Sequence, residues 1–252
     1  MSQHIRELVK GMLNGNQNSL SQLISLVENN EWSAEEILDK DRVALRKIWR
    51  LGITGPPGAG KSTLAAGLVR EIRSKGLSVG MIAVDPSSAV SGGAVLGDRI
   101  RMEQHFLDRE VFIRSVATRG SYGGLSKSIP NIIRLLEASG KDIIMIETVG
   151  VGQSEVAIKE IVDTVIVVLT PEGGDSIQFM KAGLIEIAHI VVVNKSDRVG
   201  AEIFASEIMG VLSMGRKTEW QVPVVNTQAI YRTGMEQLYQ ELEKHRKFLG
   251  LG

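Results

Sequence analysis

The chain has 252 residues, of which 43% are apolar and 23% charged, proportions typical of a soluble globular protein with one large domain. Basic and acidic residues number 29 each, so the formal net charge is zero and no nucleic-acid partner is expected. The absence of cysteine excludes a disulfide framework and a thiolate metal site, and is compatible with a cytoplasmic location. No apolar run reaches the roughly 18 residues of a membrane span, so no membrane partner is expected either.

Residues 1–47 are expected to form an N-terminal helical extension. The apolar residues between Ile5 and Met12 lie on one helical face, and the same spacing recurs between Leu20 and Val27. Ser33 and Glu36 have the spacing of a capping box, which predicts the start of a third helix. We expect these helices to pack on the main domain, and a partner-binding surface is the alternative.

From residue 48 to residue 252, short β-branched apolar runs alternate with helical stretches. Apolar runs of this length suit strands buried on both faces, and their alternation with helices predicts an α/β fold with a mainly parallel sheet flanked by helices. Ligands of such sheets bind at the carboxyl ends of the strands. The predicted strands are Ile48–Thr54, Val79–Val84, Val111–Val116, Ile143–Ile146, Val165–Leu169, Ile190–Val193 and Val222–Val225.

A glycine-rich loop between the first of these strands and an amphipathic helix matches the P-loop pattern G-x-x-x-x-G-K-[ST]. Its glycines let backbone N–H groups turn toward phosphate oxygens, and the helix N-terminus adds a partial positive charge. Lys61 is expected to reach the β- and γ-phosphates as a catalytic group, and Ser62 to ligate Mg²⁺. The nucleotide-binding residues expected here are Gly55, Gly58, Ala59, Gly60, Lys61, Ser62 and Thr63.

Three carboxylates are candidates for the metal. Glu147 follows the strand Ile143–Ile146 and can hold Mg²⁺ directly or through water in a catalytic role, and Gly150 can bring its N–H to the γ-phosphate. Asp85 ends another strand, and Asp98 lies in a glycine-rich stretch able to order around the γ-phosphate. The alternatives are a turn cap for Asp85 and a helix N-cap for Asp98. The expected metal ligands are Ser62, Asp85, Asp98 and Glu147.

The strand Ile190–Val193 leads into an N-K-x-D pattern, residues 194–197. The Asp197 carboxylate can accept two hydrogen bonds from guanine, whereas adenine offers no such pair. The stem of Lys195 can lie along the face of the base. Farther on, a backbone N–H such as that of Ala229 can meet the guanine carbonyl oxygen. The predicted base-binding residues are Asn194, Lys195, Asp197, Gln228 and Ala229.

On these motifs the chain resembles the MeaB or ArgK-like GTPases, which are associated with methylmalonyl-CoA mutase. The resemblance extends over about residues 48–215. It is carried by the P-loop, by Val84-Asp85-Pro86-Ser87-Ser88, by Leu96-Gly97-Asp98-Arg99 and by Thr118-Arg119-Gly120. The most specific stretch is Glu147-Thr148-Val149-Gly150-Val151-Gly152-Gln153-Ser154-Glu155, with Glu where switch proteins at large have Asp.

The resemblance implies a SIMIBI-class G domain that binds GTP or GDP with Mg²⁺. Its implied partner is a cobalamin-dependent acyl-CoA mutase, either methylmalonyl-CoA mutase or a relative, for which it acts as a chaperone that gates cofactor loading and protects the mutase. It also implies that residues 173–181 form a third switch that brings Lys181 toward the nucleotide for catalysis; a solvated helix lysine is the alternative. Longer members dimerise through a C-terminal helical extension, whereas this sequence stops at Gly252, so a homodimer is an open expectation.

The expected reaction is in-line attack of water on the γ-phosphate, with Lys61, Mg²⁺ and P-loop amides stabilising the developing charge. Gln153 can position water or cap the next helix, so we expect slow GTP hydrolysis that the partner accelerates. Three alternatives are open. A small-molecule kinase has no use for the N-K-x-D pattern; a nickel-inserting GTPase usually carries Cys/His ligands, which this sequence lacks; and a scaffold would bind GTP without hydrolysing it.

Overall fold

The computed structural model describes residues 2–38, 48–85, 107–118, 126–149, 157–172, 183–214 and 219–251. Seven strands pair in parallel in one sheet, in the order β3-β2-β4-β1-β5-β6-β7. They are β1 (Trp49–Thr54), β2 (Val79–Asp85), β3 (Val111–Ala117), β4 (Ile143–Glu147), β5 (Thr164–Leu169), β6 (Ile190–Asn194) and β7 (Val224–Thr227). Every predicted strand is present, with ends shifted by at most two residues, and the predicted α/β fold is confirmed.

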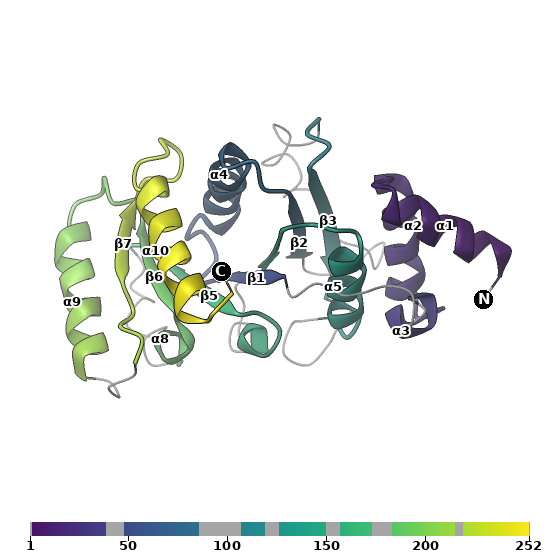
Figure 1. Cartoon of the computed structure of the whole chain (residues 1–252). Helices are drawn as coiled ribbons and strands as arrows, with labels where there is room; N and C mark the ends of the chain where they lie inside the picture. The colour runs from purple at the N-terminus through teal and green to yellow at the C-terminus, as the bar shows by residue number, and fades with distance from the viewer. Residues whose placement is uncertain are drawn as a thin grey trace.

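Helices cover both faces of this sheet (Figure 1). Because successive strand residues point to opposite faces, Val165 and Val167 pack on one side of β5 while Ile166 and Val168 pack on the other. The first side carries α5 (Ile129–Ala138), the 3₁₀ turn η2 (Ile158–Glu160), α8 (Leu184–Ile187) and α9 (Ala201–Met214). The second carries α4 (Lys61–Ser74) and α10 (Met235–Phe248). Burial on both sides explains the uninterrupted apolar strands.

The three N-terminal helices, α1 (Gln3–Leu13), α2 (Gln17–Glu28) and α3 (Ala34–Ile37), lie beside β3 and α5 at one end of the molecule (Figure 1). Their apolar residues join the core on the α5 side of the sheet. Arg114 of β3 fixes α2 through an ion pair with Glu28 and hydrogen bonds to Ser21 and Ser25. The capping box predicted at the start of α3 is present. The predicted division between residues 47 and 48 stays a prediction, since residues 39–47 lie outside the described ranges.

A buried polar chain joins the amino ends of the central strands to α10. The Trp49 indole N–H donates to the Thr164 hydroxyl at 2.9 Å, and that hydroxyl lies 2.9 Å from Nδ1 of His245. His245 is 1% exposed and its ring contacts that of His189. Burial, with a smaller contribution from His189, lowers the pKa of His245 to about 4, so the ring is neutral in the folded protein at neutral pH.

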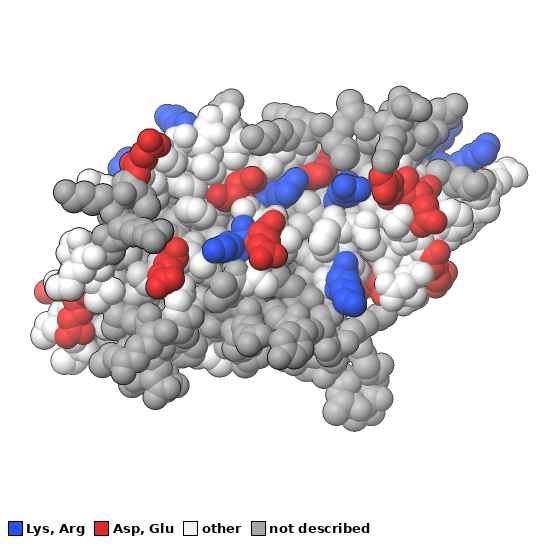
Figure 2. Space-filling view, turned by 90° about the horizontal axis from the view of Figure 1, so that it is seen from below, with Lys and Arg blue, Asp and Glu red and all other residues white. Residues whose placement is uncertain are grey.

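On the face drawn in Figure 2, acidic and basic side chains of the described residues lie interspersed. In the part of the chain that the structure describes, no helix combines the length and the apolar character needed to cross a membrane.

Candidate functional site

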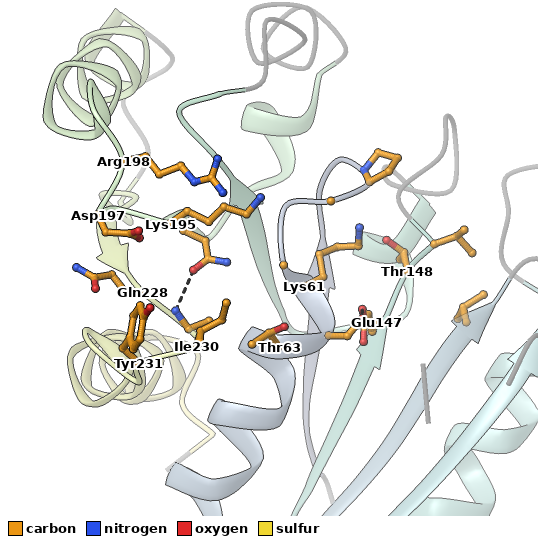
Figure 3. A pocket seen from close by; sticks show the side chains of 18 residues that line it. Lys61, Thr63, Glu147, Thr148, Lys195, Asp197, Arg198, Gln228, Ile230 and Tyr231 are labelled. Carbon is orange, nitrogen blue, oxygen red and sulfur yellow. Dashed lines mark hydrogen bonds between the residues drawn. The ribbon is translucent and has the colours of Figure 1, made fainter. Parts of the chain in front are cut away.

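A pocket of about 840 Å³ opens where the parallel strands end in their carboxyl termini. Four parts of the chain form its wall: the loop after β1 with the start of α4, the end of β2, the end of β4, and the loops that follow β6 and β7 (Figure 3). The lining residues are Pro57, Gly58, Gly60, Lys61, Ser62, Thr63, Val84, Glu147, Thr148, Val149, Asn194, Lys195, Asp197, Arg198, Gln228, Ala229, Ile230 and Tyr231.

The backbone path of the loop after β1 requires glycine at two positions, Gly55 and Gly60. Gly55 has φ +141°, and a Cβ there would lie 2.1 Å from the carbonyl oxygen of Val168 on the neighbouring strand. Gly60 has φ +88° and directly precedes α4, and it has no side chain that could cap the first N–H groups of that helix. This is the arrangement in which a helix N-terminus binds an anion.

Lys61 at the start of α4 and Glu147 at the end of β4 bring opposite charges to this end of the pocket. The Lys61 ammonium donates to the carbonyl oxygens of Gly55 and Pro56 at 2.9 and 3.0 Å, which holds the loop closed around it. The Ser62 hydroxyl donates to Oε1 of Glu147 at 2.6 Å, linking the helix to the end of β4. Lys61, Ser62 and Glu147 are all buried, so their interactions are little screened by water.

Asn194, the last residue of β6, connects the two ends of the pocket. Its side-chain N–H₂ donates to the carbonyl oxygen of Ala59 in the glycine-rich loop at 2.8 Å. Its side-chain oxygen accepts from the Thr227 hydroxyl and from the Ala229 N–H, each at 3.1 Å. A single buried amide therefore holds the phosphate-binding loop and the loop after β7 in a fixed relation.

The far end of the pocket is built from two loops with unusual backbone conformations. Lys195 has φ +58° and Arg232 has φ +62°, and these are two of only three non-glycine residues with positive φ in the described ranges. Such conformations cost energy and cluster at functional sites. Asp197 follows Lys195, and Arg198 forms an ion pair with Glu172 after β5.

Most of the predicted site residues meet in this one pocket. Those that line it are Gly58, Gly60, Lys61, Ser62, Thr63, Glu147, Asn194, Lys195, Asp197, Gln228 and Ala229. Gly55 and Ala59 support the loop from behind, and Asp85 is buried at the end of β2 next to the lining residue Val84. Asp98, Gly150, Gln153 and Lys181 lie outside the described residues.

Sequence reasoning missed several lining residues. Arg198 directly follows the predicted base-binding residue Asp197, and Ile230 and Tyr231 come next after Ala229, so nearness in the sequence is the signal that could have found them. Thr148 shows no such local signal: its hydroxyl donates to that of Thr54 at 2.9 Å and ties β4 to β1 beneath the pocket. The Ala229 N–H, predicted to meet a guanine oxygen, donates to Asn194 in this structure. Among the described residues, the next amide, that of Ile230, has no hydrogen-bond partner.

Within the described ranges, no group of three or more acidic or histidine side chains is arranged as a metal site. The Ser62–Glu147 pair nevertheless fits a hard cation. A hydroxyl that donates its hydrogen to a carboxylate keeps its oxygen lone pairs for another contact, and Mg²⁺ prefers oxygen ligands of this type.

Comparison with known proteins gives one consistent result. A family model described as methylmalonyl-CoA mutase-associated GTPase MeaB matches residues 20–252. The chain is 48% identical to a putative GTPase of Pyrococcus horikoshii over 251 residues, which are 98% of this chain and 79% of that protein. It is 35% identical to the mitochondrial methylmalonic aciduria type A homolog of Mus musculus, covering 95% of this chain and 62% of that protein.

Among solved structures, an LAO/AO transport system kinase matches with a TM-score of 0.75 and 27% sequence identity, over 100% of this chain and 78% of that one. The family match includes every residue that lines the pocket. The chain therefore belongs to the MeaB family of methylmalonyl-CoA mutase-associated GTPases.

Proposed function

We propose that this GTPase binds GTP and GDP with Mg²⁺ in the pocket described above and acts on a cobalamin-dependent acyl-CoA mutase. The observation that carries the nucleotide assignment is the junction at Asn194, which bonds to the glycine-rich loop and to the loop after β7 across a single pocket. A phosphate cradle and a base-reading motif are thereby parts of one site. The family description, which names methylmalonyl-CoA mutase, supports the choice of partner.

At the phosphate end, we assign the first amides of α4 and the glycine-rich loop to the phosphate oxygens. Lys61 keeps the loop closed through its bonds to Gly55 and Pro56, and its charge faces the β- and γ-phosphates. Charge that develops on the transferred phosphoryl group is stabilised by these preorganised donors, because they need not reorient during the reaction.

Ser62 and Glu147 are the described residues that would hold Mg²⁺. Bound there, Mg²⁺ would neutralise charge on the β- and γ-phosphate oxygens. Asp85, buried at the end of the neighbouring strand β2, and Asp98 complete the proposed set of ligands. The proposed γ-phosphate contact of Gly150 and the catalytic role of Lys181 belong to the same scheme.

At the base end, Asp197 takes the two N–H groups on one edge of guanine, and Lys195 covers one face of the ring. We assign the guanine carbonyl oxygen to the amide of Ile230, because the Ala229 N–H predicted for this contact already donates to Asn194, and we assign Ala229 and Gln228 to the same edge of the pocket. Adenine would leave the Asp197 carboxylate poorly paired, so the site discriminates against ATP.

In the proposed cycle, binding and hydrolysis of GTP gate the loading of the cobalamin cofactor into the mutase and protect the loaded enzyme. Slow hydrolysis by the isolated protein suits this role, since the timing of the switch is then set by the partner. If the isolated protein hydrolysed GTP rapidly, the GTP-bound state would be lost before the mutase could respond to it.

The test is single-turnover GTP hydrolysis by the isolated protein and by the protein mixed with cobalamin-dependent acyl-CoA mutases, methylmalonyl-CoA mutase first. We expect slow hydrolysis alone and acceleration by the cognate mutase, which should also co-purify in the presence of a non-hydrolysable GTP analogue. Fast hydrolysis without a partner would contradict the switch role. A preference for ATP in a competition assay would instead favour the small-molecule kinase.

A further inference from the structure

Two large apolar side chains stand exposed at the base end of the pocket. Ile230 is 76% exposed and Tyr231 is 72% exposed, and both line the pocket. Leaving such side chains in water forgoes the free energy of burying them, so paired exposure beside a cavity indicates a surface that a ligand covers. We call these two side chains the base ledge.

The backbone that carries the base ledge is fixed before any ligand binds. Gln228 and Thr233 form an isolated β-bridge that closes the turn, and the Tyr231 N–H donates to the Gln228 carbonyl oxygen at 2.9 Å. Gly234 ends the turn with φ +78°, where a Cβ would lie 2.2 Å from the carbonyl oxygen of Asn226. The base ledge is therefore carried by a turn whose backbone is already held in place, so covering it with a ligand requires little ordering of the backbone.

The wall opposite the ledge already has its own polar groups. In Figure 3, Lys195 and Asp197 lie on one side of the base end of the pocket, and Ile230 and Tyr231 lie on the other. The positive φ of Lys195 sets the direction of its side chain on that wall. A planar ring between the two walls would present one face to the Lys195 stem and the other to apolar atoms.

We propose that the base ledge, Ile230 with Tyr231, packs on the face of the guanine base that Lys195 does not cover. This inference rests on the proposed function and extends it, because nothing in the edge-reading contacts of Asp197 requires it. Stacking on an aromatic ring is insensitive to the identity of the base, since every base has a π-face. The ledge therefore supplies affinity, and Asp197 supplies the choice of guanine.

The consequence is a specific pattern of binding constants. Replacing both ledge residues with alanine should weaken GDP binding roughly tenfold or more, the range seen when a base loses an aromatic partner. Inosine diphosphate, which lacks the 2-amino group, should lose affinity by the same factor. Because the lost contact is equal in ground state and transition state, KM for GTP should rise while kcat stays unchanged.

The experiment is isothermal titration of GDP, inosine diphosphate and ADP into the wild-type chain, the double variant Ile230→Ala/Tyr231→Ala and Asp197→Ala. Ile203→Ala is the matched control, since Ile203 is 68% exposed on α9 away from the pocket. The conservative variant Tyr231→Phe should bind GDP like the wild type. Both ledge side chains are exposed, so the double variant should keep the wild-type Tm.

The proposal is overturned if the folded double variant binds GDP within twofold of wild type, or if it loses affinity for GDP but not for inosine diphosphate. Asp197→Ala should behave differently and reduce the ratio of GDP to inosine diphosphate affinity. If the wild-type chain binds ADP as tightly as GDP, the proposed guanine site fails, and the effect of the double variant on ADP then tests the ledge separately.

Discussion

Replacing Asn194 with alanine should weaken both the fold and the nucleotide site, because one amide holds two loops. Asn194 is 3% exposed, and it makes three hydrogen bonds, to Ala59, Thr227 and Ala229. After the substitution, the Ala59 carbonyl and the Ala229 N–H would remain buried without their partner, whereas the Thr227 hydroxyl can rotate toward another acceptor.

Each lost hydrogen bond costs roughly 1 kcal/mol, and a buried group left without a partner costs somewhat more. Three bonds therefore predict a loss of about 3 kcal/mol in the free energy of unfolding. Part of this loss appears in binding, since nucleotide must then order both loops itself. We expect GDP affinity to fall by about tenfold or more, which corresponds to at least about 1.4 kcal/mol.

The assay is urea unfolding of the variant together with titration of GDP. Asn194→Asp should not rescue the protein, because it replaces the donor facing the Ala59 carbonyl with a second acceptor. Asn226→Ala is the matched control, since Asn226 lies exposed on the neighbouring strand β7. Unfolding within about 0.5 kcal/mol of wild type, with unchanged GDP affinity, would refute the assignment of Asn194 as the link between the loops.

Three further changes have outcomes set by particular contacts. Gly55→Ala should lower the free energy of thermal unfolding by about 2 kcal/mol or more, because the added Cβ would meet the Val168 carbonyl and φ is +141°. Gly210→Ala, which adds a Cβ in open space on α9, should be neutral or stabilising. Glu147→Gln should slow single-turnover GTP hydrolysis on the order of a hundredfold and raise the Mg²⁺ concentration required, and unchanged Mg²⁺ dependence would count against its role. The pKa of His245 is about 4 in the folded protein against an ordinary 6.5. The free energy of unfolding should therefore fall by up to about 3 kcal/mol as the pH is lowered from 6.5 toward 4. Urea unfolding measures this dependence, and the variant His245→Gln should flatten it.

The strands and the phosphate-binding loop were predictable because their signals are local. The run from Ile190 to Val193 is apolar at every position, as a strand buried on both faces requires, and the spacing from Gly55 to Ser62 is a short pattern with a direct physical meaning. The capping box at Ser33 and Glu36 is local in the same sense, and its two reciprocal bonds are present.

The contacts between distant segments were not predictable in this way. Asn194 was recognised as part of a base-reading motif, but its bond to Ala59 joins residues 135 positions apart. The strand order, the Thr54–Thr148 pair and the β-bridge from Gln228 to Thr233 also depend on how the chain folds back on itself. The periodicity of apolar residues in a single sequence indicates which residues are buried, but it does not indicate which distant segments contact one another.

The central claim is that this pocket binds a guanine nucleotide through Asp197, and competition between nucleotides tests it most directly. A fluorescent GDP analogue bound to the wild-type chain should be displaced by GDP at least about a hundredfold more effectively than by ADP, because adenine leaves the Asp197 carboxylate poorly paired. Asp197→Asn, which turns one acceptor into a donor, should lose this preference and bind xanthosine diphosphate better than GDP. Equal displacement by GDP and ADP in the wild type would contradict the claim.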